Sequence, residues 1–198
     1  MPSMATISFN MGLEAIVRAY RASQATFKAQ HDAAGRRFAE YEAEATSQEA
    51  DDWDFGEQIG EELYEAEVGI RLVREAFAMT LYHFWEKQAA EVLGLTSHYF
   101  RTLEAAAAAD PRFRIDAPGL NRLRLIANCI KHAGGSELFS LDPTLFDAAL
   151  IPQSATSRTG WHDALRLRDR DVESAIVAVR ASGPRSAPST DLVEEVTP

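Results

Sequence analysis

Two long segments of the chain repeat apolar residues every three or four positions. They span about residues 10–46 and about residues 57–93. This spacing gathers the apolar side chains on one face of an α-helix, so it predicts two amphipathic helices of unusual length. The first stripe comprises Leu13, Ile16, Tyr20, Phe27, Ala34, Phe38 and Tyr41. The second comprises Ile59, Leu63, Ala66, Ile70, Val73, Phe77, Leu81 and Phe84.

The two stripes favour an antiparallel helical hairpin. At a rise of about 1.5 Å per residue, each helix would be roughly 50 Å long. Helices in proteins gain most of their stability from packing, so two such stripes are expected to face each other. The stretch "TSQEADDWDFG" lies between them and is the expected turn. Gly35 falls inside the first helix, where we expect it to bend the axis.

Shorter helices are expected to pack at the base of this hairpin. A third covers about residues 96–109, with Thr96 as its N-cap. A fourth begins after Asp116, carries Pro118 in its first turn and ends at Gly134–Gly135. These signals predict an all-α fold.

The C-terminal third of the chain has a weaker pattern. Residues 136–168 contain apolar anchors without a long period, and "WHDALRLRD" is expected to form a short extended piece that leads into Asp169 as an N-cap. A fifth helix covers about residues 170–182. The Pro- and Ser-rich residues 183–198 are expected to be a disordered tail. We therefore expect one helical domain over residues 1–182.

The net charge of −10 is concentrated in the hairpin. Between Arg37 and Arg71 there are 12 acidic residues and no lysine or arginine, which leaves +2 for the rest of the chain. Such a run is typical of a solvated helix face. The alternative is that the acidic hairpin 40–67 binds a basic protein partner. The acidic balance does not exclude a local cationic site elsewhere.

The expected location is the cytoplasm. The N-terminal stretch "MPSMATISFNMGLEAIV" lacks a basic start followed by a long apolar run, so we expect no secretory signal. No apolar run approaches the roughly 18 residues that a membrane span requires, so no membrane partner is expected. The single cysteine, Cys129, excludes an internal disulfide framework and a multi-cysteine zinc site.

The stretch "RLRLIANCIKHAGG" carries the densest polar pattern on the fourth helix. At about 100° per residue, five polar side chains fall within an arc of about 100°. They are Asn121, Arg124, Asn128, Lys131 and His132, with no acid among them. One interpretation is a solvated face whose cations suit the negative end of the helix dipole. The other is a site for a negatively charged ligand.

These residue types suit cleavage of RNA without a metal. Arginine and lysine stabilise a phosphate or a developing oxyanion, and histidine can move a proton on a ribose 2′-hydroxyl. We assign catalysis to His132, Asn128 and Arg124, and substrate binding to Lys131 and Arg122. No cofactor or metal is expected.

The stretch "ANCIKHAGG" resembles the signature helix of the HEPN superfamily of small all-helical domains. In that family an arginine, often followed by asparagine, precedes a histidine by a few residues. Asn128 and His132 match the asparagine and histidine, whereas the arginine position holds Ala127. Arg124 lies one turn before Asn128 on the same face. The similarity covers about nine residues by motif and residues 60–135 by topology.

The HEPN resemblance implies a partner and a function. Family members form dimers that pair their signature helices, and many cut RNA in toxin–antitoxin and phage-defence systems. The implied protein is an effector that acts on RNA, as a homodimer or a heterodimer with a related chain. Other members are non-catalytic, so the alternative is a helical dimerisation or protein-interaction module.

The stretch "LYHFWEKQ", residues 81–88, is the second candidate for function. In the family, an earlier helix that often carries a polar residue packs against the signature helix. His83 and Glu86 lie one turn apart and are expected to contact the substrate. The alternative is that Phe84 and Trp85 are core or dimer anchors, with Glu86 facing solvent.

Other constellations are weaker. A di-iron bundle needs Glu-x-x-His on paired helices, whereas His83 and Glu86 have the reverse order and no second copy. Cys129 is expected to be a small buried residue and not a nucleophile. His162 has no partner that the sequence reveals.

Overall fold

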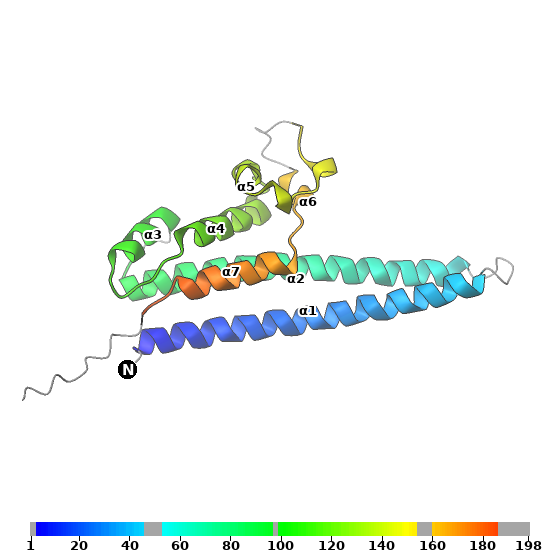
Figure 1. Ribbon diagram of the computed structural model, residues 1–198, viewed down its shortest axis with the longest axis horizontal. Coiled ribbons are helices and arrows are strands. Elements are labelled where there is room, and N and C mark those ends of the chain that lie inside the picture. Colours follow the sequence, from blue (N-terminus) through cyan, green and yellow to red (C-terminus); the bar gives the residue numbers. More distant parts are fainter. Residues whose placement is uncertain (1–2, 46–52, 97–98, 154–159, 186–198) are drawn as a thin grey trace, which may run out of the picture.

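The computed structural model describes residues 3–45, 53–96, 99–153 and 160–185. Its dominant feature is the antiparallel pair α1 (Met4–Ala45) and α2 (Trp53–Leu93), which confirms the predicted hairpin (Figure 1). α1 begins six residues earlier than expected and continues without interruption through Gly35. The fold is all-α, as predicted.

Aromatic pairs join the two long helices along their length. Near the base, the rings of Phe9 and Phe84 lie 5.3 Å apart between centroids. Further along, Tyr20 packs on Phe77 at 5.4 Å. Such pairs add to the stabilisation that burial of the stripes provides.

Glycines on one helix receive aromatic rings from the other. A Cβ placed on Gly69 would lie 2.3 Å from the ring of Phe27, and one on Gly12 would lie 2.7 Å from the ring of Phe84. These distances are too short for real Cβ contacts. The glycines therefore let the two helices approach at fixed positions, which helps to set the register of the hairpin.

α2 ends where the sequence predicts, just before Gly94. Gly94 adopts a left-handed conformation with φ of 67°, and the Leu95 N–H donates to the carbonyl of Ala90. This pattern closes α2 in the manner of a Schellman motif. The predicted N-cap at Thr96 is therefore wrong, since α3 (Phe100–Ala109) begins later and has Tyr99 as its N-cap.

The fourth helix agrees with its sequence signals. α4 (Ala117–His132) has Asp116 as its N-cap, and the Asp116 carboxylate accepts a hydrogen bond from the Gly119 N–H. The helix ends just before Gly134, with Ala133 in a left-handed conformation. α4 packs against both α2 and α7 (Asp169–Ala181).

The weakly patterned region forms several short elements above α4. These are α5 (Ser136–Leu141), η1 (Pro143–Leu145), η2 (Ala148–Leu150) and α6 (Trp161–Ala164). The expectation of an extended piece over "WHDALRLRD" is wrong for its first four residues, which are helical. Only Leu165 pairs in an extended fashion, with Phe146. Packing among the rings of Phe139, Phe146 and Trp161 organises this region.

The last helix completes the bundle. α7 begins at Asp169, one residue earlier than expected, with Arg168 and not Asp169 as its N-cap. The Trp85 indole N–H donates to the carbonyl of Ser182 just beyond this helix. Gly183–Arg185 pair with Arg112–Arg114, so the folded unit extends three residues past the expected boundary at 182. Residues 186–198 of the expected tail lie outside the described residues.

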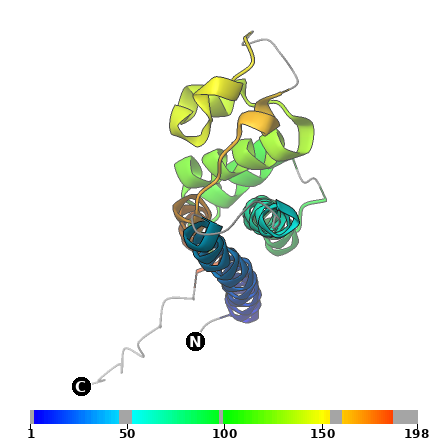
Figure 2. The same cartoon turned by 90° about the vertical axis from the view of Figure 1, so that its right-hand side faces the viewer.

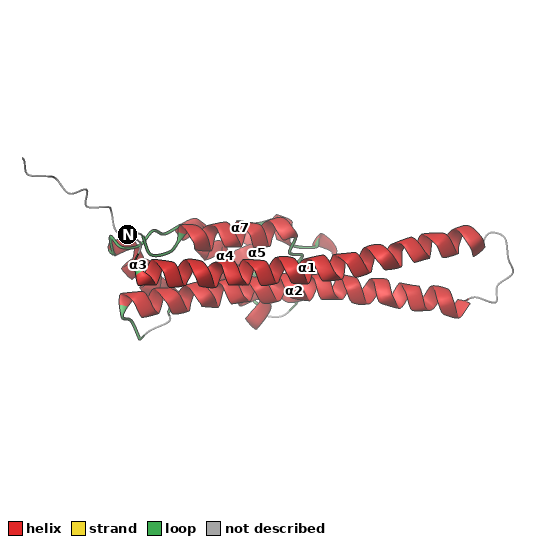
Figure 3. Cartoon of the chain, turned by 90° about the horizontal axis from the view of Figure 1, so that it is seen from below, coloured by secondary structure: helices red, strands yellow, loops and turns green. Residues whose placement is uncertain are grey.

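Viewed along its length, the molecule has α1, α2, α4 and α7 around a common apolar interior (Figure 2). The far ends of α1 and α2 project past the shorter helices as a two-helix arm (Figure 3). In the part of the chain that the structure describes, no helix combines the length and apolar character needed to cross a bilayer.

Candidate functional site

The exposed surface of α4 coincides with the predicted polar arc. Lys131 and His132 are exposed, and Asn121, Arg124 and Asn128 are half-buried. The opposite side of the helix is buried against the bundle. The structure therefore presents the polar side chains of α4 on one face, as the helical spacing predicts.

Arg122 does not belong to this face. Its guanidinium donates to Asp142 at 2.8 Å and to Asp171 at 2.8 Å. Asp171 is only 7% exposed. Two carboxylates therefore already engage Arg122, on a side of α4 away from the polar face, and its assignment to substrate binding stays a prediction.

Arg124 is on the polar face, but its side chain leans towards the N-terminal end of α4. Its Nε and Nη2 atoms donate to Asn121 Oδ1 at 3.2 and 2.9 Å. The guanidinium also lies over the ring of Phe100, 5.3 Å from the centroid. His132 is eight residues further on, about 12 Å along the helix axis. Within one chain, Arg124 and His132 are therefore not neighbours.

Lys131 and His132 form the open end of the face. Neither makes a hydrogen bond or an ion pair within the described residues, and the same holds for Asn128. Their polar groups are available to a ligand. They also face solvent and not an enclosed pocket, so a complete active site would need a second surface.

Ala127 occupies the arginine position of the HEPN pattern, and it is buried. Only 3% of Ala127 is exposed, in the core that α4 shares with its neighbours. An arginine at this position would have to place its charge among apolar side chains. The packing around position 127 therefore favours alanine over the arginine of the family pattern.

The second candidate stretch forms a short chain of polar contacts on α2. His83 Nδ1 lies 2.9 Å from Glu86 Oε2. Burial raises the pKa of Tyr82, and its hydrogen bond to Glu86 raises the pKa further. His83 is exposed and Glu86 is mostly buried. Trp85 is fully buried in the core, which agrees with the alternative interpretation of that residue as an anchor.

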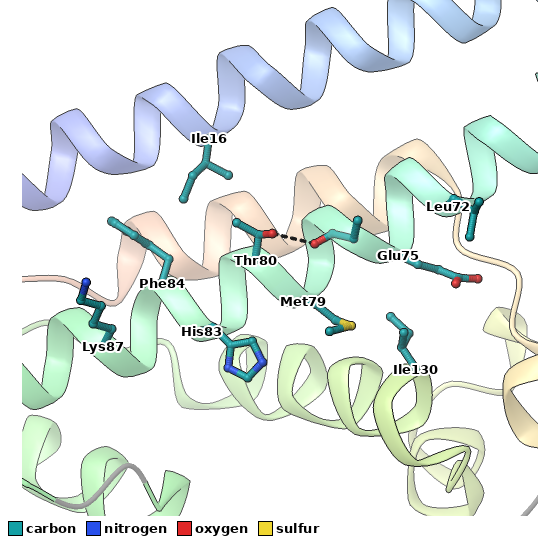
Figure 4. Close-up of a pocket in the computed structure, with 10 residues that line it drawn as sticks. Ile16, Leu72, Glu75, Met79, Thr80, His83, Phe84, Lys87 and Ile130 are labelled. Atoms are coloured by element: carbon teal, nitrogen blue, oxygen red, sulfur yellow. Dashed lines mark hydrogen bonds between the residues drawn. The ribbon is translucent and has the colours of Figure 1, made fainter.

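An apolar groove of about 720 Å³ lies beside His83. Figure 4 shows that it runs along α2 between α1 and α4, with His83 pointing towards α4. Leu72, 53% exposed, lies at one end, and Lys87 lies at the other. Ile130 is the residue of α4 that lines the groove. α4 therefore contributes to both surfaces: Ile130 lines the groove, and the polar side chains of α4 lie on another face of the same helix.

A second histidine–carboxylate pair was not visible in the sequence. His162 Nε2 lies 2.9 Å from Glu75 Oε2, and the Glu75 side chain is almost fully buried. The two residues are 87 positions apart. No local signal connects them, because α6 reaches α2 only through the tertiary fold.

Cys129 is fully buried in the core. Burial raises the pKa of its thiol to about 12, and the nearby carboxylate of Glu75 acts in the same direction. The thiol is therefore protonated at neutral pH. This agrees with the expectation of a small buried residue.

The acidic hairpin 40–67 is only partly described. Arg37 forms an ion pair with Glu62 across the two helices, and His31 lies 3.7 Å from Glu67. Asp51 and Asp52 of this segment lie outside the described residues. A basic protein partner for this segment stays a prediction.

The assembled site is an exposed cationic helix face with a histidine at its end and a histidine–glutamate pair on the neighbouring helix. Among the described residues there is no group of three or more histidine, cysteine or acidic side chains placed to hold a metal ion. A scan against protein-family models, a search of curated proteins and a search of solved structures each return no match.

Proposed function

We propose that this protein acts on RNA and that the exposed face of α4 binds the phosphate backbone. The observation that carries the proposal is the end of α4, where Lys131 and His132 are exposed and unpartnered within the described residues. Asn128 lies on the same face one turn earlier. Cationic and amide side chains are the usual partners of phosphate oxygens.

The RNA strand would run along α4. Lys131 lies roughly 10 Å beyond Arg124 along the axis, so the two cations would contact different phosphates. The Arg124 guanidinium is held by Asn121 and by the ring of Phe100, so it loses little freedom on binding. It also lies 3.7 Å from the exposed carboxylate of Glu137, which a phosphate would displace. This arrangement supports an extended contact better than a pocket for a single phosphate.

The reaction proposed is metal-independent cleavage. His132 would take the proton of a ribose 2′-hydroxyl while the 2′-oxygen attacks the adjacent phosphorus. The bond from phosphorus to the 5′-oxygen breaks, and that oxygen takes up a proton. The products are a 2′,3′-cyclic phosphate and a 5′-hydroxyl. A second proton-transfer group is required, and His132 of a second copy in a homodimer would supply it.

This chemistry fits the HEPN-like effector that the sequence pattern suggests, with a role in a toxin–antitoxin or phage-defence system. A related chain in a heterodimer would serve the same purpose as a second copy.

A second function is a non-catalytic interaction module. Two observations favour it: Ala127 is buried where the family pattern has arginine, and the groove along α2 leaves Leu72 exposed. An apolar groove between helices suits an amphipathic partner helix. In that case the polar face of α4 would only be solvated.

The experiment is incubation of purified full-length protein with structured RNA, with and without EDTA. His132→Ala should lower the cleavage rate about 10²–10⁴-fold, the usual cost of losing a general acid–base group. Lys131→Ala should weaken RNA binding and reduce its salt dependence, because fewer counterions are released. His31→Ala is the control, since it removes a half-buried histidine that lies on α1 and away from the polar face of α4.

Cleavage that survives EDTA and is lost in His132→Ala supports a nuclease. Binding without cleavage, weakened by Lys131→Ala, supports an RNA-binding protein that does not cut. If wild-type protein neither binds nor cuts RNA, the interaction module stands and the RNA function is rejected.

A further inference from the structure

Four arginines line a hollow where the link between α6 and α7 crosses α2. Arg71 and Arg74 come from α2, and Arg166 and Arg168 come from the link. The hollow has a volume of about 340 Å³, which is within the range of small-ligand sites. Figure 1 shows this link descending from α6 to the start of α7, beside the middle of α2. None of these residues belongs to the polar face of α4.

Two of the arginines are anchored by the protein itself. Arg74 donates to Asp169 at 2.9 Å and to the carbonyl of Leu167 at 3.2 Å. Arg166 donates to the carbonyl of Asp163 at 2.7 Å and lies 3.5 Å from Asp147. These contacts fix one wall of the hollow.

The other two arginines are available. Arg71 and Arg168 are exposed and form no ion pair within the described residues. The one acid in the lining is Glu67, which lies 3.7 Å from His31. Like charges that line one hollow repel each other unless an anion offsets them. Arg71 and Arg168 are therefore the two cations of the lining for which the described residues supply no ion pair.

The remaining lining is aromatic and apolar. Tyr64 is 68% exposed, although it is a large ring. Val68 and Leu167 complete this side. A ligand that matches the whole hollow has an anionic end for the guanidinium groups and a flat ring for Tyr64. Arginine binds phosphate through paired N–H donors, and tyrosine stacks on nucleobases.

We propose that this hollow binds a phosphorylated nucleoside, with the phosphate at Arg71 and Arg168 and the base against Tyr64. The nucleotide is either a free mononucleotide or one unit of an RNA strand. The chemistry at the pocket is the same for both sources. The proposal does not depend on the proposed function, because it uses a different set of residues.

The test is titration of the full-length protein by calorimetry with four probes: adenosine 5′-monophosphate, adenosine, inorganic phosphate and a short single-stranded RNA. Adenosine monophosphate should bind and adenosine should not. Arg71→Ala and Arg168→Ala should each weaken nucleotide binding about tenfold, the effect of one lost charged hydrogen bond. Tyr64→Ala should weaken binding of the nucleotide but not of inorganic phosphate.

The control is Arg36→Ala, which removes an exposed arginine of α1 outside the hollow. Circular dichroism of each variant checks that it is folded. Loss of mononucleotide binding in the pocket variants identifies a free nucleotide as the ligand. If only the RNA binds, and the pocket variants weaken it more than Arg36→Ala does, the ligand is a unit of RNA.

The proposal is overturned if Arg71→Ala and Arg168→Ala weaken neither the binding of adenosine monophosphate nor the binding of RNA beyond the effect of Arg36→Ala. Adenosine binding as tightly as its monophosphate would also overturn it. His132→Ala and Lys131→Ala separate the two proposals, because they should leave mononucleotide binding unchanged whether or not the α4 face acts on RNA.

Discussion

Nη2 of Arg122 lies 2.8 Å from Oδ1 of Asp171, and this contact ties α4 to α7. The same guanidinium reaches Asp142 at the end of α5. One side chain therefore joins three helices through two carboxylates. The side chain of Arg122 therefore serves as a link between α4, the end of α5 and α7.

Replacing Arg122 with methionine should destabilise the fold. The substitution keeps an unbranched side chain but leaves the buried Asp171 without its charged partner, at a cost of roughly 1–3 kcal/mol. Lys131→Met, on the exposed face, should change the free energy of unfolding by no more than about 0.5 kcal/mol. Urea denaturation measures both. Equal effects for the two variants would contradict a structural role for Arg122.

Replacing Gly69 with alanine should also destabilise the protein. The new Cβ would meet the Phe27 ring at 2.3 Å, and overpacking of this kind typically costs about 1–3 kcal/mol. Gly60→Ala, on the same helix with nothing within 4 Å of its Cβ, should instead stabilise the protein by about 0.5–1 kcal/mol. Thermal denaturation compares the two. A gain from Gly69→Ala would show that the helices do not need this close approach.

The lowered pKa of Asp169 predicts that the stability of the protein depends on pH. Its burial would raise the pKa of the carboxyl group, but hydrogen bonds from Lys28 and Arg74 outweigh that effect and hold the pKa below its usual value. A carboxyl whose pKa is lower in the folded state stabilises the protein above about pH 4, the unfolded pKa. That contribution is lost as the pH falls through the folded pKa.

The corresponding variant is Asp169→Asn. It should be less stable than wild type at pH 7, and the difference should shrink when denaturation is repeated below about pH 4. Asp163→Asn is the control for loss of an exposed acid near the same link. A difference that stays constant from pH 7 to pH 3 would contradict the role assigned to the ion pairs of Asp169.

Cys129 should be inert towards thiol reagents in the native protein. Its pKa of about 12 keeps the thiol protonated near pH 7, and its side chain is fully buried. A chromogenic disulfide reagent should therefore react slowly with the folded protein and completely after addition of urea. Rapid reaction of the folded protein at pH 7 would mean that α4 opens or that the thiol is exposed.

The hairpin and α4 could be predicted because their signals are local and repeated. In α1 and in α2, many apolar residues indicate the same buried face. Asp116, Pro118 and Gly134 mark the ends of α4. Thr96 misled the prediction of α3, because a good N-cap residue is not sufficient when the preceding residues are already used to close α2. The short elements after α4 have too few residues to show a period.

The polar face of α4 was predictable from the same helical spacing, whereas the ion-pair partners of Arg122 were not. Arg122 lies outside the polar arc on a helical wheel, at about 160° from Arg124, but its partners are 20 and 49 residues away. The hollow at Arg71 and Arg168 combines residues about a hundred positions apart. Contacts of this kind depend on how helices pack, and no single stretch of sequence records them.

The two-helix arm beyond the bundle has a consequence for local unfolding. Figure 3 shows the far ends of α1 and α2 beyond the shorter helices, where each long helix has only the other as a helical neighbour in the described part of the chain. Segments with few tertiary neighbours open at lower free energy than the core. Amide hydrogens in the arm should therefore exchange with solvent while those of Leu81 and Trp85 remain protected, so the hairpin can fray from its far end without unfolding the bundle.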